Sequence, residues 1–374
     1  MSRSVNFSEM RVVKLLETSI PRIKSRSAVA AIALLVLTAS GLPAQQLLPL
    51  RITTGTITIM RMIQWVAYEE GIYKKNGLDV DQCIPQGTVN DMKRILNVTS
   101  PAQYTCKPGG ARSPFSLSGG TPAFLSQAVD PATLAKNRIR AEGDPVKSVN
   151  LASVQERTDY VLFARKDITL PEQLKGKRIG FTGRLNILEF QALLFAKAMG
   201  WEPGKDVTLV EDRAGTIEGI TSGRVDAFIA GEGPEWQALQ AGYKPLIDFR
   251  AWKVPMASSS VNADRAWLKD NRETARRFIK SLVDTIAVMK KDKQAAYRAM
   301  AKYYNITDPK MQEFFYNAWD FPPKPYPAVE GLRNVKVMYR GIYPELDKYK
   351  VEDFVDDSFI RELDQSGYID RLYK

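Results

Sequence analysis

Short apolar segments alternate with amphipathic ones between residues 167 and 248. The segment 174–183 (LKGKRIGFTG) ends in Thr-Gly, and a helical pattern follows over 187–199, closed by Gly200. The segments 206–212 (DVTLVED) and 222–233 (SGRVDAFIAGEG) repeat this arrangement. Strands that alternate with helices through Gly-bearing loops predict a parallel sheet covered by helices. Ligands bind beyond the carboxyl ends of such strands, so we expect binding groups in these loops.

Similar patterns of strands and helices occur before residue 167 and after residue 248. An apolar segment over 47–55 (LLPLRITTG) precedes a helical pattern over 59–70, and residues 69–87 are typical of a helix end, an Asn-Gly turn and a strand. We expect Asn271 to cap a long helix, and helical segments to continue to Tyr304. The apolar positions of that long helix follow the helical period: Ala275, Phe278, Ile279, Leu282, Ile286 and Met289.

The first 44 residues have the features of an export signal. Six basic residues against two acidic ones precede an apolar run over 28–37, and a small-residue stretch ends at Ala44. The apolar run is much shorter than the ~20 residues of a membrane-spanning helix. No Cys lies near the end of this run, the first being Cys83, which argues against a lipoprotein anchor. We therefore expect an exported periplasmic protein, translated from Met1 or Met10 and cleaved near Ala44.

Charge and composition narrow the possible functions. The net charge is +11, and without residues 1–44 the chain keeps 47 basic and 40 acidic residues, or +7. This surplus mildly favours an anionic ligand. No basic run is interleaved with stacking aromatics, so nucleic acid is not expected as a partner. The chain contains no His, which excludes His-metal sites and the Ser-His-Asp and Cys-His forms of catalysis.

The two cysteines, Cys83 and Cys106, leave two alternatives open. An even count in an exported chain favours a disulfide, and the other possibility is a pair of buried thiols. We expect the disulfide.

Several short motifs, in this order, resemble a known family. They are residues 71–80 (GIYKKNGLDV), residues 174–181 (LKGKRIGF), the helix ending in Gly200-Trp201, and residues 223–228 (GRVDAF). The chain is similar to the NitT/TauT and SsuA/THI5-like (NMT1-like) substrate-binding proteins of ABC importers. The resemblance implies a type-II-like periplasmic binding protein: two α/β lobes joined by a hinge, with a ligand cleft between them.

The resemblance also implies how the chain is divided after the expected signal peptide of residues 1–44. Residues 45–158 and 250–374 would form the first lobe together with C-terminal helices, and 159–249 would form the second lobe. Residues 99–122, rich in Pro, Gly and Ser, depart from the family pattern and are typical of a loop insertion. We expect a surface excursion, and the alternative is that the insertion lines the cleft.

Candidate ligand-binding residues lie in loops after strands of both lobes. Arg184 is the leading candidate, since its planar fork suits a carboxylate or sulfonate, although a surface arginine is the plainer explanation. Asn186, with Glu189 three residues later, is also expected to cap its helix. Glu232 is suited to a ligand amine or to excluding acidic ligands, and Trp252 to stacking or to core packing. The candidate set is Thr54, Gly55, Thr56, Thr182, Gly183, Arg184, Asn186, Arg213, Glu232 and Trp252.

The expected function is capture of a small anionic, aromatic or heterocyclic solute for delivery to an ABC permease. The protein would then be a monomer without a cofactor, a metal or an enzymatic activity. One alternative is a THI5-like pyrimidine-precursor enzyme, but those enzymes use a His and a cysteine-rich iron motif that this chain lacks. The other alternative is a sensing module with the same fold.

Overall fold

The computed structural model describes residues 46–55, 59–109, 113–119, 148–212, 215–318 and 320–374. The expected signal peptide, residues 1–44, lies outside these ranges, and so do Thr56 and Arg213. No helix in the described part of the chain is long and apolar enough to cross a membrane.

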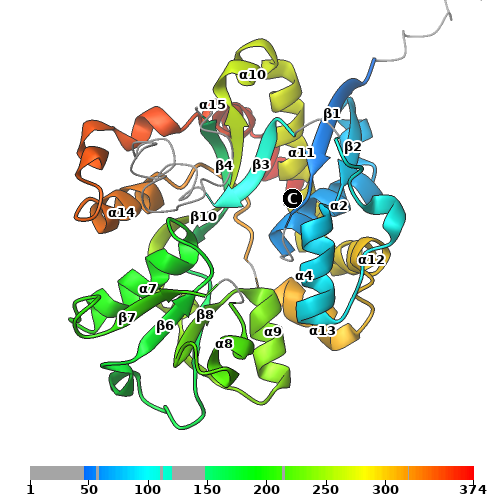
Figure 1. The fold of residues 1–374 in the computed structure, drawn as a ribbon. Coiled ribbons are helices and arrows are strands. Elements are labelled where there is room, and N and C mark those ends of the chain that lie inside the picture. Colours follow the sequence, from blue (N-terminus) through cyan, green and yellow to red (C-terminus); the bar gives the residue numbers. More distant parts are fainter. Residues whose placement is uncertain (1–45, 56–58, 110–112, 120–147, 213–214, 319) are drawn as a thin grey trace, which may run out of the picture. The chain divides into compact units, whose positions relative to one another are not determined.

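The second lobe is built on a five-stranded sheet with the order β7-β6-β8-β5-β9 (Figure 1). Strands β6, β7 and β8 run parallel, which confirms the parallel arrangement expected from the sequence. Strand β5 is antiparallel to both its neighbours. The bounds are β5 Val161–Ala164, β6 Arg178–Phe181, β7 Thr208–Glu211, β8 Ala227–Ala230 and β9 Pro245–Asp248.

Helices cover this sheet because its strands are apolar on both faces; β5 and β8, for example, are buried throughout. One apolar cluster contains α7 (Ile187–Ala198) and a smaller one lies beside α8 (Ile217–Thr221) and α9 (Glu232–Gln240). Each of these helices follows a parallel strand, so its N-terminus lies near the carboxyl edge of the sheet.

The first lobe contains two smaller sheets. Strands β1 (Leu48–Thr53) and β2 (Leu78–Cys83) pair in parallel. Strand β10 (Pro255–Asp264) lies between β3 (Phe115–Gly119) and β4 (Ser148–Arg157), and both pairings are antiparallel. The helices that pack with these strands are α2 (Ile59–Glu69), α3 (Ile72–Lys75), α4 (Gln86–Leu96), α10 (Arg265–Asp270), α11 (Arg272–Lys291), α12 (Lys293–Tyr304), α13 (Pro309–Asn317), α15 (Ser358–Gln365) and α16 (Tyr368–Leu372).

Two local expectations for this lobe are wrong. Residues 115–119 are a strand and not part of a loop: the alternation in FSLSG pairs with β10, and this tertiary pairing outweighs the Pro- and Gly-rich surroundings. Asn271 occupies the N-cap position of α11, but its side-chain amide donates to the Trp267 carbonyl, because α10 ends at the same residue. The apolar face expected for α11 is confirmed, since all six of its positions are buried.

The structure joins Cys83, at the end of β2, to Cys106 through a disulfide. Backbone hydrogen bonds continue the link, from Ile84 N to the Tyr104 carbonyl at 2.7 Å and from Cys106 N to the Ile84 carbonyl at 2.9 Å. The first part of the 99–122 segment is therefore fixed to the end of β2.

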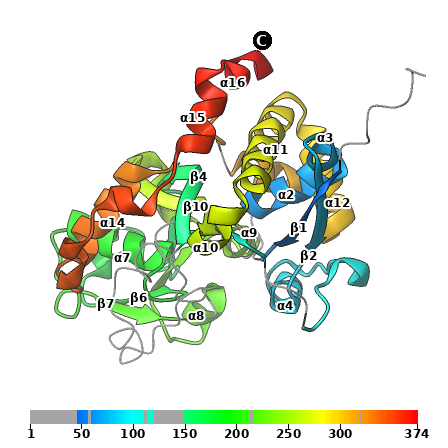
Figure 2. The same cartoon turned by 90° about the horizontal axis from the view of Figure 1, so that it is seen from above.

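The segment 328–354 packs on the apolar core of the second lobe, although the division expected from the sequence assigns it to the first. Leu332 and Tyr339 of α14 (Val329–Tyr339) share a cluster with Phe181 and Phe190. Figures 1 and 2 both show α14 beside α7. Helix α14 also lies directly on β10: a Cβ atom at Gly331 would fall 2.2 Å from the Met256 carbonyl carbon. Only glycine allows so close a contact.

Candidate functional site

The loop after β1 has a buried side and a side that faces polar groups. Thr54 is fully buried, and its hydroxyl donates to Gln64 Oε1 at 3.3 Å. A Cβ atom at Gly55 would lie 3.8 Å from Thr88 Oγ1 and 3.9 Å from Arg61 Nη1. Thr54 therefore contributes to packing, whereas Gly55 lies against a cationic and a hydroxyl side chain.

Arg61 and Thr88 are candidate binding residues that the sequence analysis missed. Arg61 lies in the first turn of α2, which contains no acidic residue. A helix N-terminus carries partial positive charge and normally has acidic side chains nearby. An arginine in the first turn adds to that positive charge and therefore indicates an anion-binding site. This indication could have been read from the sequence. Thr88 lies in the first turn of α4, where Pro85 is the N-cap and supplies no side-chain cap.

The loop after β6 holds four of the expected residues. The Asn186 side chain accepts from Leu188 N at 2.9 Å and from Glu189 N at 3.1 Å, so it caps α7. Thr182 lies against the next loop, since a Cβ atom at Gly215 would fall 2.0 Å from Thr182 Cγ2. A Cβ atom at Gly183 would lie 3.1 Å from Asn186 Nδ2, so Gly183 is close to the Asn186 side chain. The β6–α7 and β7–α8 loops thus touch at the carboxyl edge of the sheet.

Arg184 has a partner within the protein. Its Nη1 lies 3.6 Å from Glu189 Oε1, and the two side chains are 47% and 8% exposed. Glu189 also accepts from Leu185 N at 2.5 Å and from the Tyr339 hydroxyl at 3.1 Å. Burial raises the pKa of Glu189, against the effect of these hydrogen bonds and of Arg184. Arg184 is accessible to a solute, but part of its charge is already balanced by Glu189.

Helix α9 begins differently from α7. Its N-cap, Gly231, supplies no side chain, and the first turn carries two buried carboxylates, Glu232 and Glu235. A Cβ atom at Gly231 would fall 3.1 Å from the Tyr160 ring. Two acids at a helix N-terminus oppose the binding of a further anion at that point.

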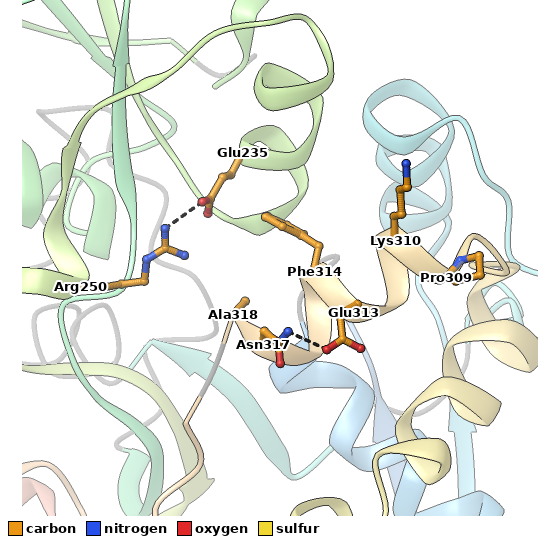
Figure 3. A pocket seen from close by; sticks show the side chains of 8 residues that line it. All are labelled: Glu235, Arg250, Pro309, Lys310, Glu313, Phe314, Asn317 and Ala318. Atoms are coloured by element: carbon orange, nitrogen blue, oxygen red, sulfur yellow. Dashed lines mark hydrogen bonds and ion pairs between the residues drawn. The ribbon is translucent and has the colours of Figure 1, made fainter.

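A cavity of about 570 Å³ lies between α9 and α13 (Figure 3). It falls in the size range of small-molecule sites. None of the residues expected from the sequence lines it. Its lining residues are Glu235, Arg250, Pro309, Lys310, Glu313, Phe314, Asn317 and Ala318.

Ion pairs organise the α9 side of this cavity. Arg250 Nη2 lies 2.9 Å from Glu235 Oε1, and Arg250 Nε lies 2.8 Å from Asp248 Oδ1. Burial raises the pKa of Glu235, while Arg250 lowers it. One guanidinium thus serves two carboxylates, and of these three groups Glu235 and Arg250 line the cavity as an ion pair.

The aromatic candidates belong mainly to the packing of the lobes. Trp252 is half-buried, with its ring 5.0 Å from that of Phe249, so core packing is the better explanation for it. Trp236 of α9 contacts Phe314 of α13, with ring centroids 5.2 Å apart. Within the described residues, no three His, Cys, Asp or Glu side chains gather to hold a metal ion.

The comparisons agree with this architecture. The NMT1/THI5-like family model matches residues 123–296. No curated protein matches the chain in sequence. The periplasmic nitrate-binding protein NrtA from Synechocystis PCC 6803 has 14% identity and a TM-score of 0.64, with 86% of this chain and 90% of that chain covered.

Two further solved structures share the fold. The periplasmic aliphatic sulphonate-binding protein SsuA from Escherichia coli has 16% identity and a TM-score of 0.57, covering 82% of this chain and 98% of that one. The desulfurization enzyme DszB has 16% identity and a TM-score of 0.54, covering 84% and 99%. These findings confirm the resemblance seen in the motifs. Residues 123–296 therefore match the NMT1/THI5-like family model, and the chain has the fold of the periplasmic binding proteins, with two α/β lobes.

Proposed function

We propose that this protein is an exported solute receptor that binds a small molecule between its two lobes and delivers it to an ABC permease. The observation that carries the proposal is the set of loops at the carboxyl ends of β1, β2 and β6. There Gly55, Arg61 and Thr88 in one lobe and Thr182, Gly183 and Arg184 in the other offer hydroxyl, guanidinium and backbone N–H donors. Donors of this kind suit an anionic group.

Export and the remaining contacts belong to the same proposal. Cleavage near Ala44 would release the protein into the periplasm, where it would act as a monomer. Thr56 and Arg213 lie outside the described residues and are proposed as further contacts from their places in the sequence. Asn186 would take part through its position at the start of α7, and Glu232 by excluding acidic groups from the start of α9.

An enzyme is the second candidate, because DszB shares the fold. The chain offers little for such chemistry. It contains no His, and its two cysteines are joined to each other. A thiolate nucleophile and an imidazole base are therefore both missing, and we propose that the protein is not an enzyme.

A thermal-unfolding screen against nitrate, alkanesulfonates, aromatic acids and pyrimidines tests the proposal. A solute at 100 times its dissociation constant should add about 2.7 kcal/mol to the free energy of unfolding. Mass spectrometry of the incubated solute should recover it unchanged. Conversion of the solute would favour the enzyme, and a panel without any stabilising compound would count against a receptor for these classes.

A further inference from the structure

Leu185 holds an unusual backbone conformation in the loop between β6 and α7. Its φ is +56°, in the left-handed region that a leucine rarely adopts. Its side chain is buried in the apolar core of the second lobe. A strained conformation of this kind persists only where surrounding contacts impose it, and it occurs often in ligand-binding loops. Leu185 lies between Arg184 and Asn186, two residues of the proposed binding loop.

The carboxylate of Glu189 supplies a contact that imposes this conformation. Its Oε2 accepts from Leu185 N at 2.5 Å. A glutamate at the third position of a helix commonly accepts from the backbone N–H of the N-cap residue. Here the acceptor instead reaches the residue before the N-cap, while the Asn186 side chain caps α7. Glu189 therefore fixes the loop that precedes its own helix.

Two further side chains surround the Glu189 carboxylate. The hydroxyl of Tyr339, a fully buried residue of α14, donates to the same Oε2 at 3.1 Å. Helix α14 is itself fixed on β10 by the close contact at Gly331. Arg184 Nη1 lies 3.6 Å from the other oxygen, Oε1, and the Arg184 side chain is half-exposed. One oxygen of Glu189 thus serves the loop backbone, and the other lies beside the guanidinium that a solute can reach.

These contacts give Glu189 two effects on the loop. Through Leu185 it fixes the backbone on both sides of that residue, and through Arg184 it restrains the guanidinium. From this geometry we infer that Glu189 is a positioning residue for an anionic solute: it holds the 182–186 loop in its binding conformation and, being buried, does not contact the solute itself. The inference rests on the proposed function, because it concerns the same site.

Two variants of Glu189 separate its effect on the loop from its charge. Calorimetry of the full chain with nitrate and with methanesulfonate measures both. Glu189→Ala removes the acceptor for Leu185 N and should weaken binding roughly tenfold, the loss expected if the loop holds its binding conformation about a tenth of the time. Glu189→Gln keeps an oxygen for Leu185 N and removes the negative charge beside Arg184, so it should bind at least as tightly as the native protein.

The chain offers a matched control for these variants. Glu330 is an exposed glutamate in the first turn of α14 that also pairs with an arginine, Arg333. Glu330→Ala should leave anion binding unchanged. Equal affinity in the native protein and Glu189→Ala would overturn the inference and leave the receptor function standing. Equal losses in Glu189→Ala and Glu189→Gln would also overturn it, because the charge and not the loop contact would then control binding.

Hydrogen exchange of the Leu185 amide, measured by NMR, tests the same contact without a solute. Exchange should be at least about tenfold slower in the native protein and in Glu189→Gln than in Glu189→Ala. If Glu189→Ala does not fold, the native protein decides alone: a Leu185 amide that exchanges as fast as an exposed loop amide would overturn the inference. Absence of nitrate and methanesulfonate binding to the native protein would instead count against an anionic solute, and the exchange rates would still show whether Glu189 holds the loop.

Discussion

Asp159 lies where the chain enters the second lobe, and its carboxyl group is expected to make stability depend on pH. The side chain is buried and accepts from Ser258 Oγ at 2.8 Å and from Gln191 Nε2 at 3.2 Å. Burial raises the pKa of Asp159 from its usual 3.8 to about 7, while Ser258, Gln191 and the charge of Arg250 act in the opposite direction. The folded protein therefore keeps this proton at pH values where the unfolded chain has released it.

The sign and the size of the effect follow from this pKa. A raised folded-state pKa gives stability that is fully present below pH 3.8 and is lost as the pH rises toward 7. A rise of about three pKa units corresponds to about 4 kcal/mol of unfolding free energy between those limits. Glu189 and Glu235 also have raised pKa values and change stability in the same direction.

Asp159→Asn isolates the contribution of this one group. The amide cannot titrate, and it can donate to Gln191 Oε1, which has no hydrogen-bond partner among the described residues. Urea unfolding of both proteins at pH 5, 6, 7 and 8 measures the difference. We expect the variant to lose stability less steeply with pH and to be the more stable protein at pH 8. Parallel curves for the two proteins would refute a buried, neutral Asp159.

Three further predictions use other parts of the structure. Gly331→Ala should lower the free energy of unfolding by at least about 2 kcal/mol, because the new Cβ would overlap the backbone at Met256; Gly341→Ala, with no atom within 4 Å, is the matched control, and equal effects would argue against close packing of α14 on β10. Cys83→Ser should cost roughly 3 kcal/mol, measured by urea unfolding of the oxidised protein, and two free thiols titrating in the denatured, non-reduced protein would exclude the disulfide. Arg184→Ala should weaken an anionic solute more than tenfold in calorimetry while changing stability by less than about 1 kcal/mol, since the arginine is half-exposed; a larger loss of stability would make it a structural partner of Glu189.

The hydrophobic periodicity of the sequence was sufficient to predict those elements in which local propensity and tertiary packing favour the same structure. Strands β6, β7 and β8 with helix α7 follow directly from apolar segments, Gly-bearing loops and an N-cap asparagine. The buried face of α11 could likewise be read from its helical spacing. In these elements the same side chains that favour the local structure also form the core, so a single pattern carries both signals.

Contacts between distant segments were not visible in the sequence. The pairing of 115–119 with β10 joins residues about 140 positions apart. The sequence around 115–119 contains no pattern that predicts this pairing. The same holds for α14, whose Tyr339 reaches Glu189 in α7. The cavity is a clearer case still, because Glu235 of α9 and Phe314 of α13 line it together only when these two helices pack against each other. Arg61 is different, since a basic residue in the first turn of a helix after a strand could have been noticed.

The central claim is that a small solute is held between the two lobes, and closure of the lobes on that solute tests it most directly. Small-angle X-ray scattering of the protein, with and without a saturating concentration of the solute identified by the unfolding screen, measures the radius of gyration in both states. A hinge that closes around its ligand makes the particle more compact. We expect the radius of gyration to fall on binding in the native protein. An unchanged radius at full occupancy would contradict capture between the lobes.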